Sequence, residues 1–372
     1  MVSASESRRD LSQDLSRTSV TAHLEAEIVA GRNLVYCASF QIAWDELLDT
    51  IVGDPLELQG NPLTARVLNK RLIGKGDIAN DCYLAMAGLG RDGIAERVYQ
   101  ALRDRFNRSP GLDLTLSSPD DILAYAFLQK RIPFDAEFEA FGDPLPFCDG
   151  VLVEAFGVDA PSTAAEQVVV LDYRHADDFV IKLQGSPEVD AMLEFGILVD
   201  HARITDDIIL AKVRPQPTLL ETVQSVLARS SEEGRIKALR EAAGAVRDAR
   251  ELFSPRLNQG SEVLRIPKID LEVLHRYSEL VNRQLLNQGF EDYFIAEALQ
   301  AIKFRLDERG ADLSSEAAIE MTLGYVAQPR QFVFDKPFLL CLKERESQVP
   351  YLAIWVDNSE FLVRAEHDPD GQ

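Results

Sequence analysis

The sequence predicts an α+β fold, because apolar residues at helical spacing come mostly before the runs that are typical of strands. Helical patterns dominate residues 33–106, and most later apolar runs are short and bounded by polar or turn residues. With 372 residues, 46% of them hydrophobic, the chain can bury a sizeable core. We expect an N-terminal tail over residues 1–20 and a single domain over residues 21–372.

The individual elements follow from these patterns in chain order. Residues 33–53 predict a short strand that continues as a helix with one apolar face. Further helices are predicted over 62–74, 77–106, 217–229, 232–252 and 278–289. Strands are predicted over 121–134, 150–158, 262–273, 301–308, 332–342 and 350–357, and as pairs within 166–185 and 195–213. The rest of residues 135–165 shows no clear pattern.

The charge of the chain limits which partners it can bind, and its cysteines and N-terminus indicate where it is located. Lys and Arg number 39 against 61 Asp and Glu, which gives a net charge of −22 and opposes binding to nucleic acid or to an anionic membrane surface. The four cysteines are far apart, which favours free thiols over a disulfide framework. The polar N-terminus resembles no signal peptide, so we expect a cytoplasmic protein and leave export without a signal peptide open.

Two local motifs could carry chemistry. Gly88, Gly90 and Gly93 match G-x-G-x-x-G, but the run before them reads as a helix and not as the strand that a dinucleotide site requires, so we expect a turn between two helices. The segment "DYRHADD", with His175 among acids, reads as a solvated bend between two strands. No nucleophile elbow, phosphate loop or paired-His zinc motif occurs, so we expect no enzyme, no cofactor and no metal site.

The last third of the chain resembles the serpin family in a series of motifs that follow one another in the family's order. Residues 265–273, "RIPKIDLEV", are similar to one of its strands, and residues 279–294 resemble the helix after that strand. "IKFRLDERG" (302–310) resembles the strand that leads into the reactive-centre loop, and "FDKPFLLCL" (334–342) and residues 347–358 resemble the closing strands. The resemblance implies a divergent serpin-like protein of prokaryotic type. Its expected fold has N-terminal helices, a large central mixed sheet, smaller sheets and a C-terminal reactive-loop region.

On this resemblance, residues 311–328 are the reactive-centre loop, which a serpin presents to a protease as bait. After cleavage the loop inserts into the large sheet as a strand and traps the acylated protease. Insertion requires side chains that alternate between two faces. The inward set is Ala311, Leu313, Ser315, Ala317, Ile319 and Met321, and the outward set is Asp312, Ser314, Glu316, Ala318, Glu320 and Thr322. The same residues also read as a short helix, so an inert loop or helix stays open.

The resemblance also implies roles for single residues. The hinge comprises Glu308, Arg309, Gly310, Ala311, Asp312 and Leu313. The candidates for the scissile region are Met321, Leu323, Gly324 and Tyr325. A bond next to Leu323 or Tyr325 suits a chymotrypsin-like target, and Arg330 lies too close to the next strand to serve a trypsin-like one. The shutter, where the family's large sheet opens, corresponds to Asn33, Cys37 and Ser39.

Several positions depart from the family pattern and leave three hypotheses. Cys37 and Ala38 stand where the family has serine and proline, Gln300 matches a histidine, and Asp312 and Leu313 replace small hinge residues. The first hypothesis is a monomeric inhibitor of a serine or cysteine protease. The second is a non-inhibitory serpin-fold scaffold, and the third is an unrelated α+β enzyme with a site near His175.

Overall fold

The computed structural model covers most of the chain. It describes residues 15–130, 132–185, 188–194, 197–203, 206–230, 256–258, 261–310, 329–345 and 347–365, with the backbone alone for 188–194 and 197–203. Within this part, no helix is both long and apolar enough to cross a membrane.

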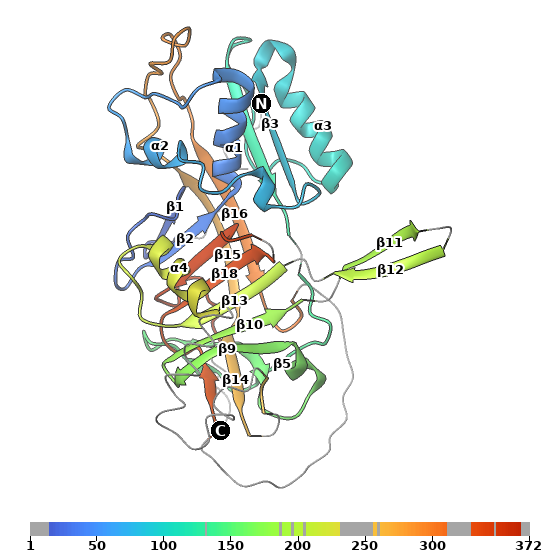
Figure 1. Cartoon of the computed structure of the whole chain (residues 1–372). Helices are drawn as coiled ribbons and strands as arrows, with labels where there is room; N and C mark the ends of the chain where they lie inside the picture. Colours follow the sequence, from blue (N-terminus) through green and yellow to red (C-terminus); the bar gives the residue numbers. More distant parts are fainter. Residues whose placement is uncertain are drawn as a thin grey trace, which may run out of the picture.

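A seven-stranded sheet forms the centre of the described structure (Figure 1). Its strands, in spatial order, are β1 (Thr18–Thr21), β2 (Asn33–Cys37), β19 (Leu352–Val356), β18 (Phe338–Glu344), β13 (Asp206–Lys212), β10 (Asp178–Gln184) and β9 (Val168–His175). Only β1 and β2 run parallel, so the sheet is mixed. This confirms the predicted α+β class with a large mixed sheet.

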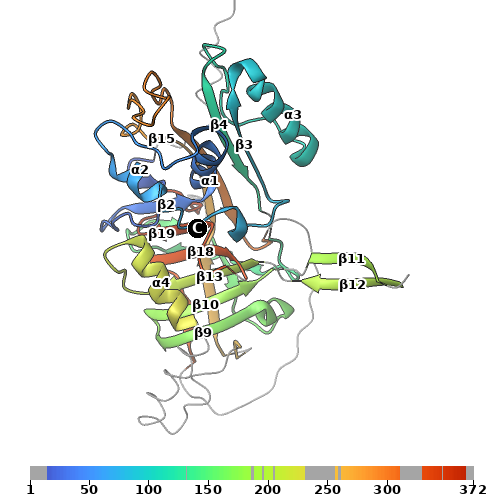
Figure 2. The same cartoon turned by 45° about the horizontal axis from the view of Figure 1, so that its top comes forward.

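The middle strands of this sheet are apolar along their whole length because both of their faces are covered. Every residue of β2, β13 and β19 is buried. Helix α4 (Leu219–Ser230) packs over β9, β10 and β19 (Figure 2). Apolar runs such as "IILA" in β13 therefore predict buried strands correctly.

Smaller sheets surround the central one. A four-stranded sheet has the order β17 (Gln331–Val333), β14 (Val263–Pro267), β8 (Ala155–Val158) and β5 (Glu139–Ala140). The two-stranded sheets are β15 (Ile269–Arg276) with β16 (Leu299–Leu306), β3 (Tyr83–Leu89) with β4 (Ile122–Leu128), and β6 (Leu145–Pro146) with β7 (Leu152–Val153). The hairpin of β11 (Glu188–Glu194) and β12 (Ile197–Arg203) projects from the body in both views (Figures 1 and 2).

Helices α1 (Ser39–Leu47) and α3 (Ile94–Phe106) pack against the β3–β4 hairpin. Helix α1 continues as a π-helical turn over Leu48–Val52 and packs across β3 and β4. Helix α3 covers the same hairpin through a separate apolar cluster. Helix α2 (Leu63–Leu68) has six residues.

Several expectations about single elements are wrong. Residues 83–89 form strand β3 and not a helix, because they pair with β4 along their whole length. Only six residues of the helix predicted over 62–74 are helical. Residues 278–289 form turns and isolated bridges in place of a helix: Asn282 has a left-handed φ of +61° and Leu285 N donates to Tyr293 O.

Two boundaries also differ from the expectation. The strand predicted over 332–342 is split into β17 and β18, because Phe334 N donates to Arg265 O and Pro337 has no N–H to donate. Strand β1 begins at Thr18, so the chain is ordered before the expected end of the tail at residue 20. The helix predicted over 232–252 lies outside the described residues.

Candidate functional site

The candidate loop, residues 311–328, lies outside the described residues, and so do Ala311, Asp312, Leu313, Met321, Leu323, Gly324 and Tyr325. Both of its flanks are described. The segment follows β16 at one end and precedes β17 at the other. The candidate site is therefore defined by the contacts that fix these two flanks.

Residues 134–138 hold the flank that follows β16. Phe138 N donates to the carbonyl oxygen of Glu308 at 2.9 Å, and Phe134 N donates to that of Arg309 at 3.3 Å. Arg309 Nε lies 3.2 Å from Glu137 Oε1. These contacts fix the direction in which the chain leaves the β15–β16 hairpin.

Gly310 is a position that only glycine fits. Its φ of +67° lies in the left-handed region, which side chains other than glycine rarely adopt. A Cβ atom there would lie 2.6 Å from both Ile132 O and Phe134 N, which are backbone atoms that cannot swing aside. The predicted hinge glycine is thus packed against a neighbouring segment of the chain.

A buried ion pair secures the same flank. Glu308 Oε2 lies 2.8 Å from Lys268 Nζ, which also lies 3.2 Å from Glu154 Oε2. Burial raises the pKa of the Glu308 carboxyl, but the hydrogen bond from Lys268, a backbone hydrogen bond and the charges of Lys268 and Arg309 together outweigh burial, so this pKa is lower than usual. Glu308 is therefore anchored as a carboxylate at neutral pH.

The flank that precedes β17 is anchored through Arg330. Its guanidinium is almost fully buried and donates two hydrogen bonds to the Glu262 carboxylate, from Nε at 2.6 Å and from Nη2 at 2.9 Å. The guanidinium carbon lies 5.3 Å from the centre of the Phe332 ring. The burial of Arg330 agrees with the expectation that it does not serve as bait.

Lys212 braces the turn between β17 and β18. Its buried ammonium donates to the carbonyl oxygens of Ala176 and Val333 at 3.0 and 2.9 Å, and to Asp335 Oδ1 at 2.6 Å. Asp177 lies 2.8 Å away, and its hydrogen bonds from Lys212 and Lys336 lower its pKa to about 2. The turn is thus tied to the β9–β10 hairpin.

Strand β16 offers an open edge. It pairs with β15 on one side, and within the described residues no strand pairs with its other side. Unpaired N–H and C=O groups along an edge can accept another strand. Since β16 runs directly toward residues 311–328, the open edge belongs to the strand that precedes the candidate loop.

Two of the predicted shutter residues meet in space. Gln300, on β16, donates through Nε2 to Ser39 Oγ and to the Cys37 carbonyl oxygen, both at 2.9 Å. Its Oε1 accepts from the Tyr277 hydroxyl. All of these residues are buried, and burial raises the pKa of the Cys37 thiol. Cys37 is thus a neutral packing residue next to a buried polar network.

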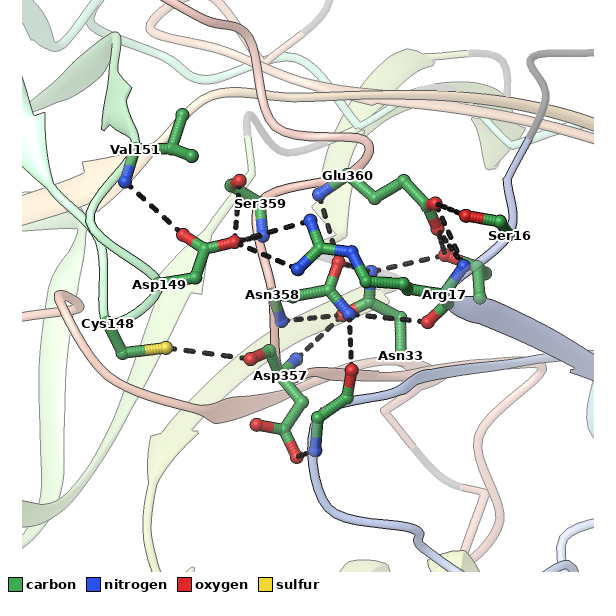
Figure 3. Close-up of polar contacts among 12 residues, drawn as sticks. Ser16, Arg17, Asn33, Cys148, Asp149, Val151, Asp357, Asn358, Ser359 and Glu360 are labelled. Carbon is green, nitrogen blue, oxygen red and sulfur yellow. Dashed lines mark hydrogen bonds and ion pairs between the residues drawn. The ribbon is translucent and has the colours of Figure 1, made fainter.

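Asn33 lies apart from this network, in a second one (Figure 3). Its Oδ1 accepts from Asp357 N and Asn358 N, and its Nδ2 donates to Asn358 Oδ1 at 2.9 Å. Asn358 Nδ2 in turn donates to the carbonyl oxygen of Arg17. Asn33 therefore joins the N-terminal segment to the turn after β19 and has no contact with Ser39.

Two backbone amides of the glycine motif are already hydrogen-bonded within the protein. A strand does precede Gly88, contrary to the expectation from the sequence, and α3 follows Gly93. However, Gly90 N donates to Asp121 O and Arg91 N to Pro119 O, so the amides that would cradle a phosphate are occupied. The motif forms a turn between strand β3 and helix α3, and not the expected turn between two helices.

The segment around His175 is the turn of the β9–β10 hairpin, as predicted. The imidazole is exposed and its Nδ1 accepts from Asp177 N. Asp172 is paired with Arg229 at 2.7 Å. Among the residues that the structure describes, no group of three or more His, Cys, Asp and Glu side chains could hold a metal ion.

The sequence did not single out the anchoring residues Lys268, Glu262 and Lys212. Each is a charged residue within or beside an otherwise apolar run, such as "RIPKI" or "ILAKV". A charge in such a place indicates a buried pair, but it does not identify the partner.

Comparison with known proteins finds similar structures only. No family model and no curated protein matches the chain. The crystal structure of Serpin48 from the insect Tenebrio molitor is 11% identical over 88% of this chain and 92% of that chain, with a TM-score of 0.43. Serpin-12 from Manduca sexta is 13% identical over 72% and 66%, with a TM-score of 0.39. Human thyroxine-binding globulin, in complex with thyroxine, is 13% identical over 76% of this chain and 77% of that chain, with a TM-score of 0.38.

At these identities the likeness concerns the fold alone. The chain is similar to serpins, as the motifs in its last third predict.

Proposed function

We propose that the protein is a serpin-like inhibitor of a serine or cysteine protease. A protease cuts within residues 311–328, and the freed part inserts as a new strand along the open edge of β16. The observation that carries this proposal is that β16, the strand that leads into residues 311–328, has an edge without a strand partner among the described residues. Anchors on both flanks, Glu308 with Lys268 and Arg330 with Glu262, keep the ends in place.

The alternation of the segment matches that of β16. In β16 the residues Gln300, Ile302 and Leu306 are buried, and the intervening Ala301, Lys303 and Arg305 are exposed. A strand added beside β16 needs the same alternation, since neighbouring strands share their faces. The inward set from Ala311 to Met321 is mostly apolar or small, and the outward set is mostly polar.

Insertion would release enough free energy to be irreversible. Each new backbone hydrogen bond contributes about 1 kcal/mol net, so an added strand of about a dozen residues contributes roughly 10 kcal/mol. The uncut protein is then a metastable state, and cleavage triggers its collapse to the stable one.

A non-inhibitory scaffold of the same fold is the second candidate. Bulky Leu313 and charged Asp312 occupy the predicted hinge, where easy insertion favours small residues. Gln300 also connects β16 to Ser39 through a buried hydrogen bond. Either feature hinders insertion, and a cut loop would then stay outside.

A pair of variants at adjacent positions distinguishes the two candidates. Ala317→Glu places a charge on the inward face of the inserted strand, and Ala318→Glu places the same charge on the outward face. Each protein is incubated with chymotrypsin and then run on a denaturing gel. An inhibitor forms a covalent complex that resists SDS; Ala318→Glu retains it, and Ala317→Glu is cut without forming it. If all three proteins, including the wild type, are only cut, the scaffold is the correct interpretation.

A further inference from the structure

Two large apolar side chains are exposed in the chain between Arg276 and Leu299, which includes the helix predicted over 278–289. Leu286 is 51% exposed and Phe294 is 60% exposed. Both lie in the loop that connects β15 to β16, at the end of the molecule that also carries α1 and α2 (Figure 1).

Short antiparallel pieces of chain build this region. Leu58 pairs with Leu285, and Gln284 pairs with Phe294. Backbone bonds reinforce the pairing: Leu286 N donates to Glu57 O at 2.8 Å, and Leu285 N donates to Tyr293 O at 2.9 Å. The pieces therefore form a small three-stranded platform, although residues 57–59 are far from the other two pieces in the chain.

The platform has two distinct faces, because successive residues of extended chain point to opposite sides. Leu58 and Leu285 are buried in a cluster with Trp44. Leu286 follows Leu285 and therefore points to the other side. Phe294 is also on the outer side, since it lies opposite Gln284, the other neighbour of Leu285. Leu286 and Phe294 are thus diagonal neighbours on one exposed face.

Acidic residues surround this face. Residues 279–297 contain four acidic residues and one arginine. Glu57, Glu291 and Asp292 are exposed. Glu291 Oε2 accepts from Gly289 N, and the carboxylates of Glu57 and Asp292 have no hydrogen-bond or ion-pair partner within the described residues.

We propose that the outer face of this platform, with Leu286, Phe294, Glu57 and Asp292, is a docking face for a cationic polypeptide segment that carries apolar side chains. The two exposed apolar side chains supply contact area, and the unpaired carboxylates supply attraction and specificity. A second copy of this chain would bring the same acidic rim against itself, and an anionic membrane would be repelled. The surface is distinct from residues 311–328, so it serves a partner beyond the proposed protease target.

The test measures how the full-length protein binds a short fluorescent peptide of alternating lysine and leucine. We expect the double variant Leu286→Ser, Phe294→Ser to weaken binding about tenfold or more, which corresponds to about 1.4 kcal/mol. Val29 is a matched control, since it is also apolar and 53% exposed, and Val29→Ser should leave binding unchanged. Glu57→Gln with Asp292→Asn should weaken binding and reduce its dependence on salt.

Three results would overturn the proposal. The first is equal binding by the wild type and the Leu286→Ser, Phe294→Ser variant. The second is equal affinity for a control peptide that lacks one of the two features. Equal affinity for a lysine–serine peptide would mean that charge alone accounts for binding, and equal affinity for a glutamate–leucine peptide would mean that apolar contact alone does. The third is a dimer in sedimentation that Phe294→Ser abolishes, which would assign the face to a second copy. Melting curves of the variants confirm that each is folded.

Discussion

The side-chain amide of Gln300 lies 2.9 Å from Ser39 Oγ, although 261 positions separate the two residues in the chain. The same amide nitrogen donates to the Cys37 carbonyl oxygen, and the amide oxygen accepts from Tyr277. The bonds connect β16, which leads into residues 311–328, to the start of α1. A movement of β16 away from α1 must therefore break a buried polar network, which is costly.

Gln300→Leu should lower the free energy of unfolding by about 3 kcal/mol, because the buried polar groups of Ser39, Cys37 and Tyr277 lose their hydrogen bonds to the Gln300 amide. Urea denaturation measures the change. Gln288 is exposed, and Gln288→Leu should change stability by less than about 0.5 kcal/mol. Equal effects of the two substitutions would show that the Gln300 network contributes nothing specific.

Glu308→Gln should destabilise the protein by about 2 kcal/mol at pH 7, because the largely buried Lys268 side chain then loses its nearer carboxylate and keeps only Glu154. The folded-state pKa of Glu308 is lowered, so its contribution is complete above the unfolded-state pKa and is lost as the pH falls through the folded-state pKa. The difference between wild type and variant should therefore shrink as the pH falls below about 4. Glu137→Gln is the control, since its pair with half-exposed Arg309 should contribute less than about 1 kcal/mol. A pH-independent difference between wild type and Glu308→Gln would contradict the assignment.

Gly310→Ala should lower the free energy of unfolding by about 3 kcal/mol or more. The new Cβ would clash with two backbone atoms of residues 132–134, and alanine would also have to adopt a left-handed φ. Gly53 separates the two effects. It has a φ of +84°, and nothing lies within 4 Å of the place that a Cβ would occupy, so Gly53→Ala should cost only about 1 kcal/mol. Thermal or urea unfolding provides both values, and a cost at Gly310 no greater than that at Gly53 would mean that the close approach is absent.

Lys212→Met should destabilise the protein by about 3 kcal/mol, because two carbonyl oxygens and Asp335 lose their buried donor. It should also raise the pKa of Asp177 above its present value of about 2, since the bond from Lys212 is the main cause of the lowering. An NMR titration of the Asp177 carboxyl measures this shift. Lys336→Met removes a half-exposed partner of the same carboxylate and should cost less than about 1 kcal/mol. If Lys336→Met lowers the free energy of unfolding as much as Lys212→Met does, Lys212 has no special role in stabilising the turn between β17 and β18.

The sequence predicts most of the central sheet, because its strands are apolar runs bounded by turn residues. Runs such as "FVIKL" in β10 and "LAIWV" in β19 cannot belong to an exposed helix face, and their length suits strands. The fold class depends on these strands, and it is confirmed.

The errors arise where distant contacts override local preference. Residues 83–89 are rich in Ala, Leu and Met, which favour helices, yet pairing of Ala85 with Ala126 and its neighbours makes them a strand. Residues 278–289 have apolar residues at helical spacing, but Leu285 pairs with Leu58. No local pattern reveals a partner that lies so far away in the chain.

The candidate site was predictable only in part. Resemblance pointed to Cys37, Ser39 and Gln300, and these residues do form one network. The partners of the ion pairs, Lys268 with Glu308 and Glu262 with Arg330, depend on how sheets pack and could not be read from spacing.

The most direct test compares the melting temperature of the intact protein with that of the protein cut once within residues 311–328, with the cut located by mass spectrometry. If the cut segment inserts beside β16, the added strand should raise the melting temperature by on the order of 20 °C. An unchanged or lower melting temperature after a cut in this segment would contradict insertion, and inhibition by this route with it.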